Sequence, residues 1–230
     1  DGSGPALLEP PSLEHWPKVT WSAGSGSRRV NLDTLTREEV QSWKPGDTLL
    51  LNGKMLTGRD AAHKRMVETL DQGGELPFDV RDAIVYYVGP SPARPGNVIG
   101  SAGPTTSGRM DAYAPRLLDL GLRGMIGKGA RNQGVIDAII RNEAVYFAAI
   151  GGGAAVIADS IKSMEVIAFE ELGAEAVRRL EVVDLPAIVA IDSTGANYYD
   201  IGRQAYLAER EGAAGDAADA AAGAGEGDKV

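Results

Sequence analysis

The chain has 230 residues, of which 23 are lysine or arginine and 32 are aspartate or glutamate, so its formal net charge is −9. A chain this acidic is a poor candidate for wrapping nucleic acid or for binding an anionic membrane surface. Because it contains no cysteine and only two histidines, we expect no disulfide, no thiolate metal site and no multi-histidine metal site.

Composition divides the chain into three parts. Residues 1–27 are rich in proline, glycine and serine, which predicts a leader or linker. Residues 28–206 form the predicted body, whereas residues 207–230 predict a fraying helix that runs into a disordered acidic tail. Because the first residue is Asp1 and not methionine, we expect a fragment or a processed form. With no signal peptide and no apolar run of bilayer length, we expect a cytoplasmic protein.

The first half of the body predicts two helices and three strands. Thr36 and Glu39 fit a capping box, which predicts a short helix that ends near residue 43. Asn52-Gly53 is a strong signal for a β-hairpin. The hairpin strands are expected over 48–51 and 54–56, followed by a helix over 59–70, ended by Gly73 and Gly74, and by a buried strand over 84–88.

In the second half, strand and helix patterns alternate. The expected elements are a helix over 109–120, a strand over 124–126, a helix over 133–141, a strand over 144–150, a helix over 154–160 and an extended segment over 165–169. A second hairpin is predicted where residues 187–191 and Tyr198-Tyr199 flank a turn over 193–197. The alternation predicts a layered α/β body with some parallel strand pairing.

Three glycine-framed loops, over residues 56–63, 103–111 and 125–129, each place one cation beside glycine near a strand–helix junction. Glycine allows the backbone to approach a ligand closely. Arg59 and Arg109 fall at predicted helix starts, where a cation opposes the helix dipole. Such a conflict is typical of a functional site, although each arginine alone also fits a solvated surface position. Two arginines and a lysine suit a small dicarboxylate.

Other motifs indicate structure more than chemistry. His63 lies on the same predicted helix face as Arg59, and we expect a hydrogen-bonded structural histidine rather than one that orients the site. The phosphate-loop pattern needs serine or threonine where this chain has Gly129. The dinucleotide fingerprint fails because Val156 stands where its last glycine belongs, so residues 151–153 predict a tight strand-to-helix turn.

Residues 103–111 (Gly-Pro-Thr-Thr-Ser-Gly-Arg-Met-Asp) resemble the signature of class I, iron–sulfur-dependent fumarate hydratases and of their tartrate dehydratase relatives. Residues 58–63 (Gly-Arg-Asp-Ala-Ala-His) and 86–90 (Tyr-Tyr-Val-Gly-Pro) are similar to two further segments of that family. Residues 127–129, 150–152 and 182–187 also match in order. The resemblance runs from about residue 30 to residue 199, which is nearly the whole body.

The resemblance implies the β subunit or C-terminal domain of a hydro-lyase that reversibly hydrates fumarate to (S)-malate. It implies the swivelling β/β/α three-layer α/β fold, with a mixed sheet and flanking helices. In the family, an α subunit or N-terminal domain carries three cysteines that hold a [4Fe–4S] cluster, which agrees with their absence here. We therefore expect this chain to need that partner and to be inactive alone, and we expect the complete enzyme to be a homo-oligomer.

Thr105 matches the family threonine proposed as the catalytic base, which takes a proton from the carbon beside the leaving hydroxyl. A neutral threonine is a poor base unaided, so it needs an activating neighbour, which the sequence does not identify. Asp60 and His63 match motif letters without an implied substrate contact. The implied substrate-binding residues are Arg59, Thr105, Thr106, Ser107, Gly108, Arg109 and Lys128.

Several alternatives stay open at this point. The nearest are tartrate dehydratase (L-tartrate to oxaloacetate) and mesaconate hydratase, since a hydroxyl or methyl difference is read by the shape of the pocket. Of a different class are a non-catalytic module that binds a dicarboxylate and a purely structural domain. Replacement of Thr105 by alanine separates a binding module, which keeps its function, from a hydro-lyase, which loses turnover.

Overall fold

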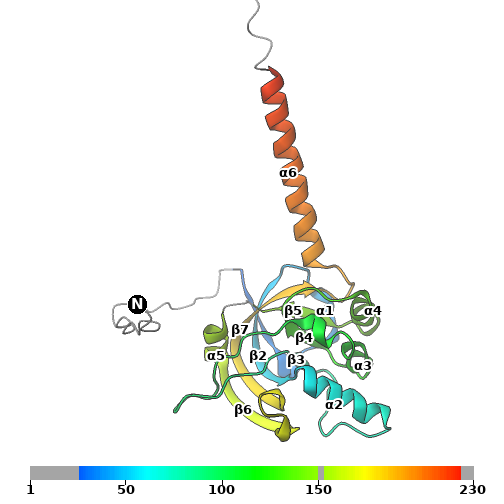
Figure 1. Ribbon diagram of the computed structural model, residues 1–230, viewed down its shortest axis with the longest axis vertical. Coiled ribbons are helices and arrows are strands. Elements are labelled where there is room, and N and C mark those ends of the chain that lie inside the picture. The colour runs from blue at the N-terminus through cyan, green and yellow to red at the C-terminus, as the bar shows by residue number, and fades with distance from the viewer. Residues whose placement is uncertain (1–25, 150–152, 224–230) are drawn as a thin grey trace, which may run out of the picture.

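The computed structural model of the chain describes residues 26–149 and 153–223. A strongly twisted sheet forms its centre, with helices around it (Figure 1). The strands are β1 Arg28–Asn31, β2 Thr48–Thr57, β3 Ile84–Tyr86, β4 Gly124–Gly127, β5 Val145–Ala148, β6 Ile161–Ala168 and β7 Val177–Ile191. The helices are α1 Arg37–Ser42, α2 Asp60–Asp71, α3 Ala114–Asp119, α4 Gln133–Asn142, α5 Ala154–Ser160 and α6 Tyr198–Gly223, with 3-10 helices η2 Leu32–Thr34, η3 Ser107–Met110 and η4 Glu170–Glu175.

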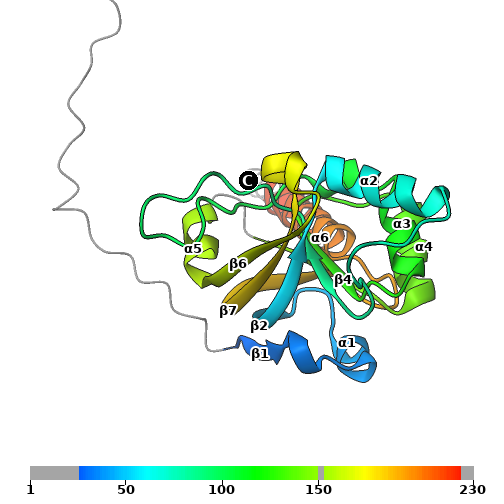
Figure 2. The same cartoon turned by 90° about the horizontal axis from the view of Figure 1, so that it is seen from below.

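The sheet closes on itself. Its strand order is β1-β2-β3-β4-β5-β7-β6, and β2 also pairs with β7, so β2, β3, β4, β5 and β7 form a closed five-stranded barrel. Strands β1 to β5 pair in parallel, whereas β7 runs antiparallel to β2, β5 and β6. Figure 2 shows β7 beside β2 and β6, with α2, α3 and α4 gathered on one side of the barrel. Mixed pairing and flanking helices are thus confirmed, and closure of the sheet was not predicted.

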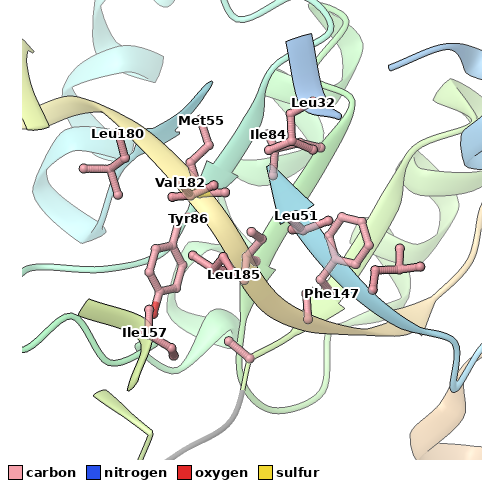
Figure 3. Packing of buried hydrophobic residues seen from close by; sticks show 14 of the residues in the cluster. Leu32, Leu51, Met55, Ile84, Tyr86, Phe147, Ile157, Leu180, Val182 and Leu185 are labelled. Carbon is pink, nitrogen blue, oxygen red and sulfur yellow. The ribbon is translucent and has the colours of Figure 1, made fainter. Parts of the chain in front are cut away.

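Strand β3 is buried on both of its faces. Successive residues of a strand point to opposite sides of the sheet. Ile84 and Tyr86 pack in one cluster with residues of β2, β5 and β7, part of which is drawn in Figure 3. Val85, between them, packs in a second cluster with residues of α2, α3 and α4. This double burial explains the almost continuous apolar run of the predicted strand.

The predicted hairpin at Asn52-Gly53 is wrong. Strand β2 runs straight through these residues, and the irregularity is a β-bulge between Leu51 and Gly53 in the pairing with β7. Gly53 has φ +106°, and Asn52 Oδ1 accepts a hydrogen bond from the backbone N–H of Asp184 at 3.0 Å. Both halves of β2 pair with the same distant strand, so the Asn-Gly conformation that often closes a hairpin here produces a bulge.

The second predicted hairpin is wrong as well. Residues 187–191 belong to β7, but Tyr198 and Tyr199 begin helix α6. Asp192 Oδ1 accepts hydrogen bonds from Thr194 N–H at 2.9 Å and from Ala196 N–H at 3.1 Å, so it stabilises the turn. Within the described residues, the two sides of the turn form a single β-bridge, between Ile191 and Asn197. The helix expected over 109–120 divides into η3 and α3, because Pro115 favours the first turn of a new helix.

The C-terminal helix extends beyond the barrel. Helix α6 projects away from it (Figure 1) and covers much of the segment in which we expected a fraying helix and a tail. Nearly all of the expected leader, the end of the tail and two of the three glycines at 151–153 lie outside the described residues. Of the helices in the part of the chain that the structure describes, none is long and apolar enough to cross a bilayer.

Candidate functional site

The candidate site lies at the carboxyl ends of β2, β3 and β4. Because these strands are parallel, their carboxyl ends share one edge of the barrel, where the following loops meet. Arg59 follows β2 and occupies the N-cap position of α2. Tyr87 follows β3, and Lys128 follows β4. Two of the three predicted cations, Arg59 and Lys128, therefore lie at the same edge because each directly follows one of these parallel strands.

The loop that carries Thr105 returns to the same edge. Thr105 N–H donates a hydrogen bond to the Tyr87 carbonyl at 2.8 Å, and Lys128 N–H donates to the Thr105 carbonyl at 3.3 Å. Ser107 N–H donates to the Lys128 carbonyl at 2.9 Å. These bonds hold the Thr105 segment against the ends of β3 and β4, so two of the three glycine-framed loops are in direct contact.

Asp60 connects the third loop to the other two. Its Oδ1 lies 3.1 Å from Nε of Arg109, and its Oδ2 lies 3.6 Å from Nε of Arg59. Arg109 Nη2 in turn donates to Oγ1 of Thr105 at 2.7 Å. The structure thus brings Arg59, Thr105 and Arg109 together around one carboxylate, at a partly exposed position.

The remaining predicted residues divide between surface and interior. Thr106, Gly108 and Lys128 are exposed at this edge. Ser107 is buried, and its hydroxyl oxygen lies 2.9 Å from the hydroxyl oxygen of Tyr146 on β5. The side chain of Ser107 therefore contacts the protein interior, whereas its neighbours in the loop face solvent.

Two tyrosines hold the Gly-Lys-Gly loop from opposite sides. The hydroxyl of Tyr146 donates to the Gly129 carbonyl at 2.8 Å, and Gly129 N–H donates to the hydroxyl of Tyr199 at 3.2 Å. Burial raises the pKa of Tyr146, so this hydroxyl stays protonated. No sequence pattern predicted this contact, because Tyr146 and Tyr199 are distant from the loop along the chain.

A buried ion pair anchors the signature loop. Arg131 Nε donates to Asp111 Oδ1 at 2.6 Å, and Asp111 Oδ2 accepts from Asn132 N–H at 2.7 Å. The guanidinium also lies over the rings of Tyr87 and Tyr146, at 5.4 and 5.0 Å from their centroids. Asp111 ends the nine-residue signature, which was a signal for its importance, but nothing in the sequence pairs it with Arg131.

His63 is buried and hydrogen-bonded, as expected. It is fully buried, its Nδ1 lies 2.9 Å from the carbonyl oxygen of Arg59, and its ring packs edge-on against Tyr87. Burial lowers its pKa to about 4. The neutral imidazole therefore donates to the backbone of the residue that begins α2, and it remains uncharged at neutral pH.

Two glycines of the motifs are required by close packing. A Cβ at Gly89 would lie 2.6 Å from Nη1 of Arg59. A Cβ at Gly127 would collide with the hydroxyl of Ser107. Both glycines make room for side chains of the neighbouring loops.

The donor set of this chain does not fit an iron–sulfur cluster. The sequence has no cysteine to supply a thiolate. Within residues 26–149 and 153–223, no group of three or more histidine, aspartate or glutamate side chains is placed to hold a metal ion. The site instead offers guanidinium, ammonium and hydroxyl groups, which bind anions.

The cationic and hydroxyl groups lie together at one edge of a mixed five-stranded barrel. This arrangement is typical of a domain that binds a small anion. The family model described as the fumarase C-terminus matches residues 2–202. "Fumarate hydratase class I, aerobic" of Escherichia coli (strain K12) is 39% identical over 189 residues, which are 80% of this chain and 34% of that protein. "Putative L(+)-tartrate dehydratase subunit beta" of Methanocaldococcus jannaschii is 39% identical over 172 residues, 72% of this chain and 88% of that protein.

The chain belongs to the fumarase C-terminal family. It spans about a third of the length of the fumarate hydratases that it matches, which include "Fumarate hydratase 2" of Leishmania major, 39% identical over 165 residues (71% of this chain and 29% of that protein). It covers most of the archaeal β subunit. The resemblance seen in the sequence motifs is thereby confirmed.

Proposed function

We propose that this chain is the β part of an iron–sulfur hydro-lyase that reversibly hydrates fumarate to (S)-malate. The observation that carries the proposal is the hydrogen bond of 2.7 Å from the Arg109 guanidinium to the Thr105 hydroxyl. It supplies the neighbour that a threonine base needs. Residues 28–206 form the catalytic domain of this proposal, with residues 1–27 as a leader and 207–230 as a tail, in a cytoplasmic enzyme.

In the dehydration direction, Thr105 Oγ1 takes the proton from the carbon beside the one that bears the hydroxyl. The Arg109 guanidinium donates to Oγ1 at 2.7 Å. A positively charged donor stabilises the alkoxide form of this oxygen, so Thr105 becomes a better base. In the hydration direction, the water gives one proton to Thr105 Oγ1 and adds its hydroxyl to one carbon, and Thr105 passes the proton to the other carbon. Asp60 holds Arg109 Nε at 3.1 Å, which keeps Nη2 aimed at Thr105.

Arg59 and Lys128 bind the carboxylates of the substrate in this proposal, together with Arg109. Thr106 and Gly108 supply further contacts from the exposed part of the loop, and Ser107 fixes its shape from within. When bound in the cysteine-bearing partner, a [4Fe–4S] cluster supplies Lewis-acid chemistry at the substrate hydroxyl. The substrate then lies between the two parts, the complete enzyme is a homo-oligomer, and this chain alone is inactive.

The nearest competing substrates are tartrate and mesaconate. The identity of 39% is the same to the Escherichia coli fumarate hydratase as to the archaeal protein named for tartrate, so identity does not rank them. The nine-residue signature is shared with the tartrate dehydratases, so it does not rank the substrates either. We propose fumarate because the relatives from Escherichia coli and Leishmania major are both named fumarate hydratases. A dicarboxylate-binding module without turnover is the alternative of another class.

The test is an anaerobic reconstitution of this chain with the cysteine-bearing partner, iron and sulfide. Hydration of fumarate and mesaconate and dehydration of tartrate are followed, with each part alone as a control. Turnover in the mixture alone supports a half-enzyme, and the fastest substrate names it. We expect Thr105→Ala to lower kcat by at least about a hundredfold. An intact complex that turns over none of the three substrates would contradict the proposal.

A further inference from the structure

Glu175 belongs to none of the motifs, yet its carboxylate contacts the loop that carries Arg59. It ends η4, in the connection between β6 and β7. Its Oε2 accepts a hydrogen bond from Ala61 N–H at 2.7 Å, and its Oε1 lies 3.5 Å from Nη2 of Arg59. One carboxylate therefore reaches both the first turn of α2 and the side chain at the N-cap of that helix.

Helix α2 depends on Glu175 for its cap. Arg59 occupies the N-cap position, but its side chain makes no capping hydrogen bond, because a guanidinium has no acceptor. A carboxylate at a helix N-terminus satisfies a free N–H and favours the positive end of the helix dipole. Glu175 supplies that carboxylate from 114 positions along the chain.

The segment that presents Glu175 is held in place by Arg178. Arg178 Nη1 donates to the carbonyls of Ala174 and Ala176 at 3.0 Å each, and Nη2 donates to the carbonyl of Gly173 at 2.6 Å. The Arg178 residue is buried, and its N–H donates to the hydroxyl of Thr57 at the end of β2. Glu175 is thus fixed relative to β2 before any ligand binds.

The Arg59 side chain passes through a narrow space beside this segment. A Cβ added at Gly89 would lie 2.6 Å from Arg59 Nη1 and 3.3 Å from the Ala174 carbonyl oxygen. The Arg59 side chain and the backbone that carries Glu175 therefore both lie close against Gly89. Together, the narrow space and the carboxylate set the direction of the guanidinium.

We propose that Glu175 is a positioning residue that holds Arg59 in the orientation in which it binds a substrate carboxylate. The substrate part of this inference rests on the proposed function. Arg59 would hold the same carboxylate in the bound substrate and in the transition state. Loss of its positioning therefore raises KM and leaves kcat almost unchanged.

The first test is kinetic and uses the reconstituted enzyme. Glu175→Gln keeps an oxygen for Ala61 N–H but removes the charge that faces Arg59. We expect KM for fumarate to rise about tenfold and kcat to change by less than about twofold, with partial recovery in Glu175→Asp. Glu171→Gln is the matched control, because Glu171 lies on the same 3-10 helix and pairs with exposed Arg65 at 2.9 Å. A normal KM in Glu175→Gln, or a fall in kcat and melting temperature without a rise in KM, would overturn the proposal.

The second test needs no activity. The Nε of Arg59 is buried and has no hydrogen-bond partner among the described residues, so the signal of its N–H is sensitive to a change in the orientation of the side chain. In the full chain labelled with 15N-arginine, and with Arg59→Lys for assignment, Glu175→Gln should shift or broaden the Arg59 signal and leave Arg65 unchanged. Glu171→Gln should do the reverse. If wild-type enzyme turns over no dicarboxylate, the proposed function fails, and an Arg59 signal unchanged in Glu175→Gln separately overturns the positioning role.

Discussion

Arg131 and Asp111 form an ion pair that is almost completely closed to solvent: their side chains are 0% and 9% exposed, and Nε lies 2.6 Å from Oδ1. The pair joins the end of the signature loop to the residues just after the Gly-Lys-Gly loop. The loops over residues 103–111 and 125–129 therefore share one buried anchor. The shape of the site depends on these two side chains, which need not touch a ligand.

Asp111→Ala should be strongly destabilising. It leaves the Arg131 charge buried without its partner, which costs about 3 to 5 kcal/mol of the free energy of unfolding. Asp119→Ala is the control, because Asp119 and Arg141 form a pair of similar geometry on the surface, where the expected loss is about 1 kcal/mol or less. Urea denaturation of the two variants measures the difference, and equal losses would show that burial of the pair is unimportant.

Arg109→Lys should lower kcat more than it raises KM. The guanidinium donates to Thr105 at 2.7 Å while its Nε faces Asp60 at 3.1 Å. Lysine has one flexible ammonium in place of this rigid fork of donors, so it does not reproduce both contacts in the same geometry. The Thr105 hydroxyl then ionises less readily, so the remaining activity should rise more steeply toward alkaline pH. A kcat profile against pH in the reconstituted enzyme tests this, and a profile with the wild-type shape argues that Arg109 does not activate Thr105.

Gly89→Ala should disturb Arg59. The added Cβ would lie 2.6 Å from the guanidinium, which forces the Arg59 side chain to change direction. This overpacking lowers the free energy of unfolding by about 1 to 3 kcal/mol. We expect a higher KM for the dicarboxylate. Gly202→Ala on α6 is the control, since a Cβ there meets no atom within 4 Å. If the two alanine variants have equal KM values, Arg59 has more room than the structure indicates.

His63 should make stability depend on pH. Its pKa is about 4 in the folded protein and about 6.5 when exposed, so only the unfolded chain takes up the proton between these values. The contribution of the neutral His63 to the free energy of unfolding is fully present above pH 6.5. It falls by up to roughly 3 kcal/mol as the pH drops from 6.5 to 4. The free energy of unfolding of His63→Gln should decline less over this window, although the carboxylates contribute equally to both proteins. Parallel curves would contradict the burial of a neutral histidine.

The elements that sequence predicted best have local causes. Thr36 Oγ1 accepts from Glu39 N–H at 3.1 Å and begins α1, as the capping box predicted. Asn132 caps α4 in the same way, at 3.0 Å from Val135 N–H. Closure of the barrel was missed because β2 pairs with residues about 130 positions later, and no periodicity carries that information. The Asn52-Gly53 prediction failed for the same reason.

The site followed a similar rule. The cations of the three glycine-framed loops predicted a shared anion site for Arg59, Arg109 and Lys128, and the family resemblance added Thr105. The structure brings Arg59, Thr105 and Arg109 together around Asp60. Glu175 and Arg131 were missed because each acts through a contact made far from the motifs in sequence. In the sequence, Glu175 cannot be told from a solvated surface glutamate. Only the fold places it beside the N-terminus of α2.

Strand β7 also determines when the barrel can form. Its 15 residues, Val177–Ile191, pair with β2, β5 and β6, and it is the last strand in the described part of the chain. During synthesis, β2 and β5 must therefore wait with open edges until β7 has left the ribosome. Pairing across so long a stretch of chain has a high entropic cost and is slow. The nascent chain is thus most exposed to mispairing and aggregation just before β7 emerges.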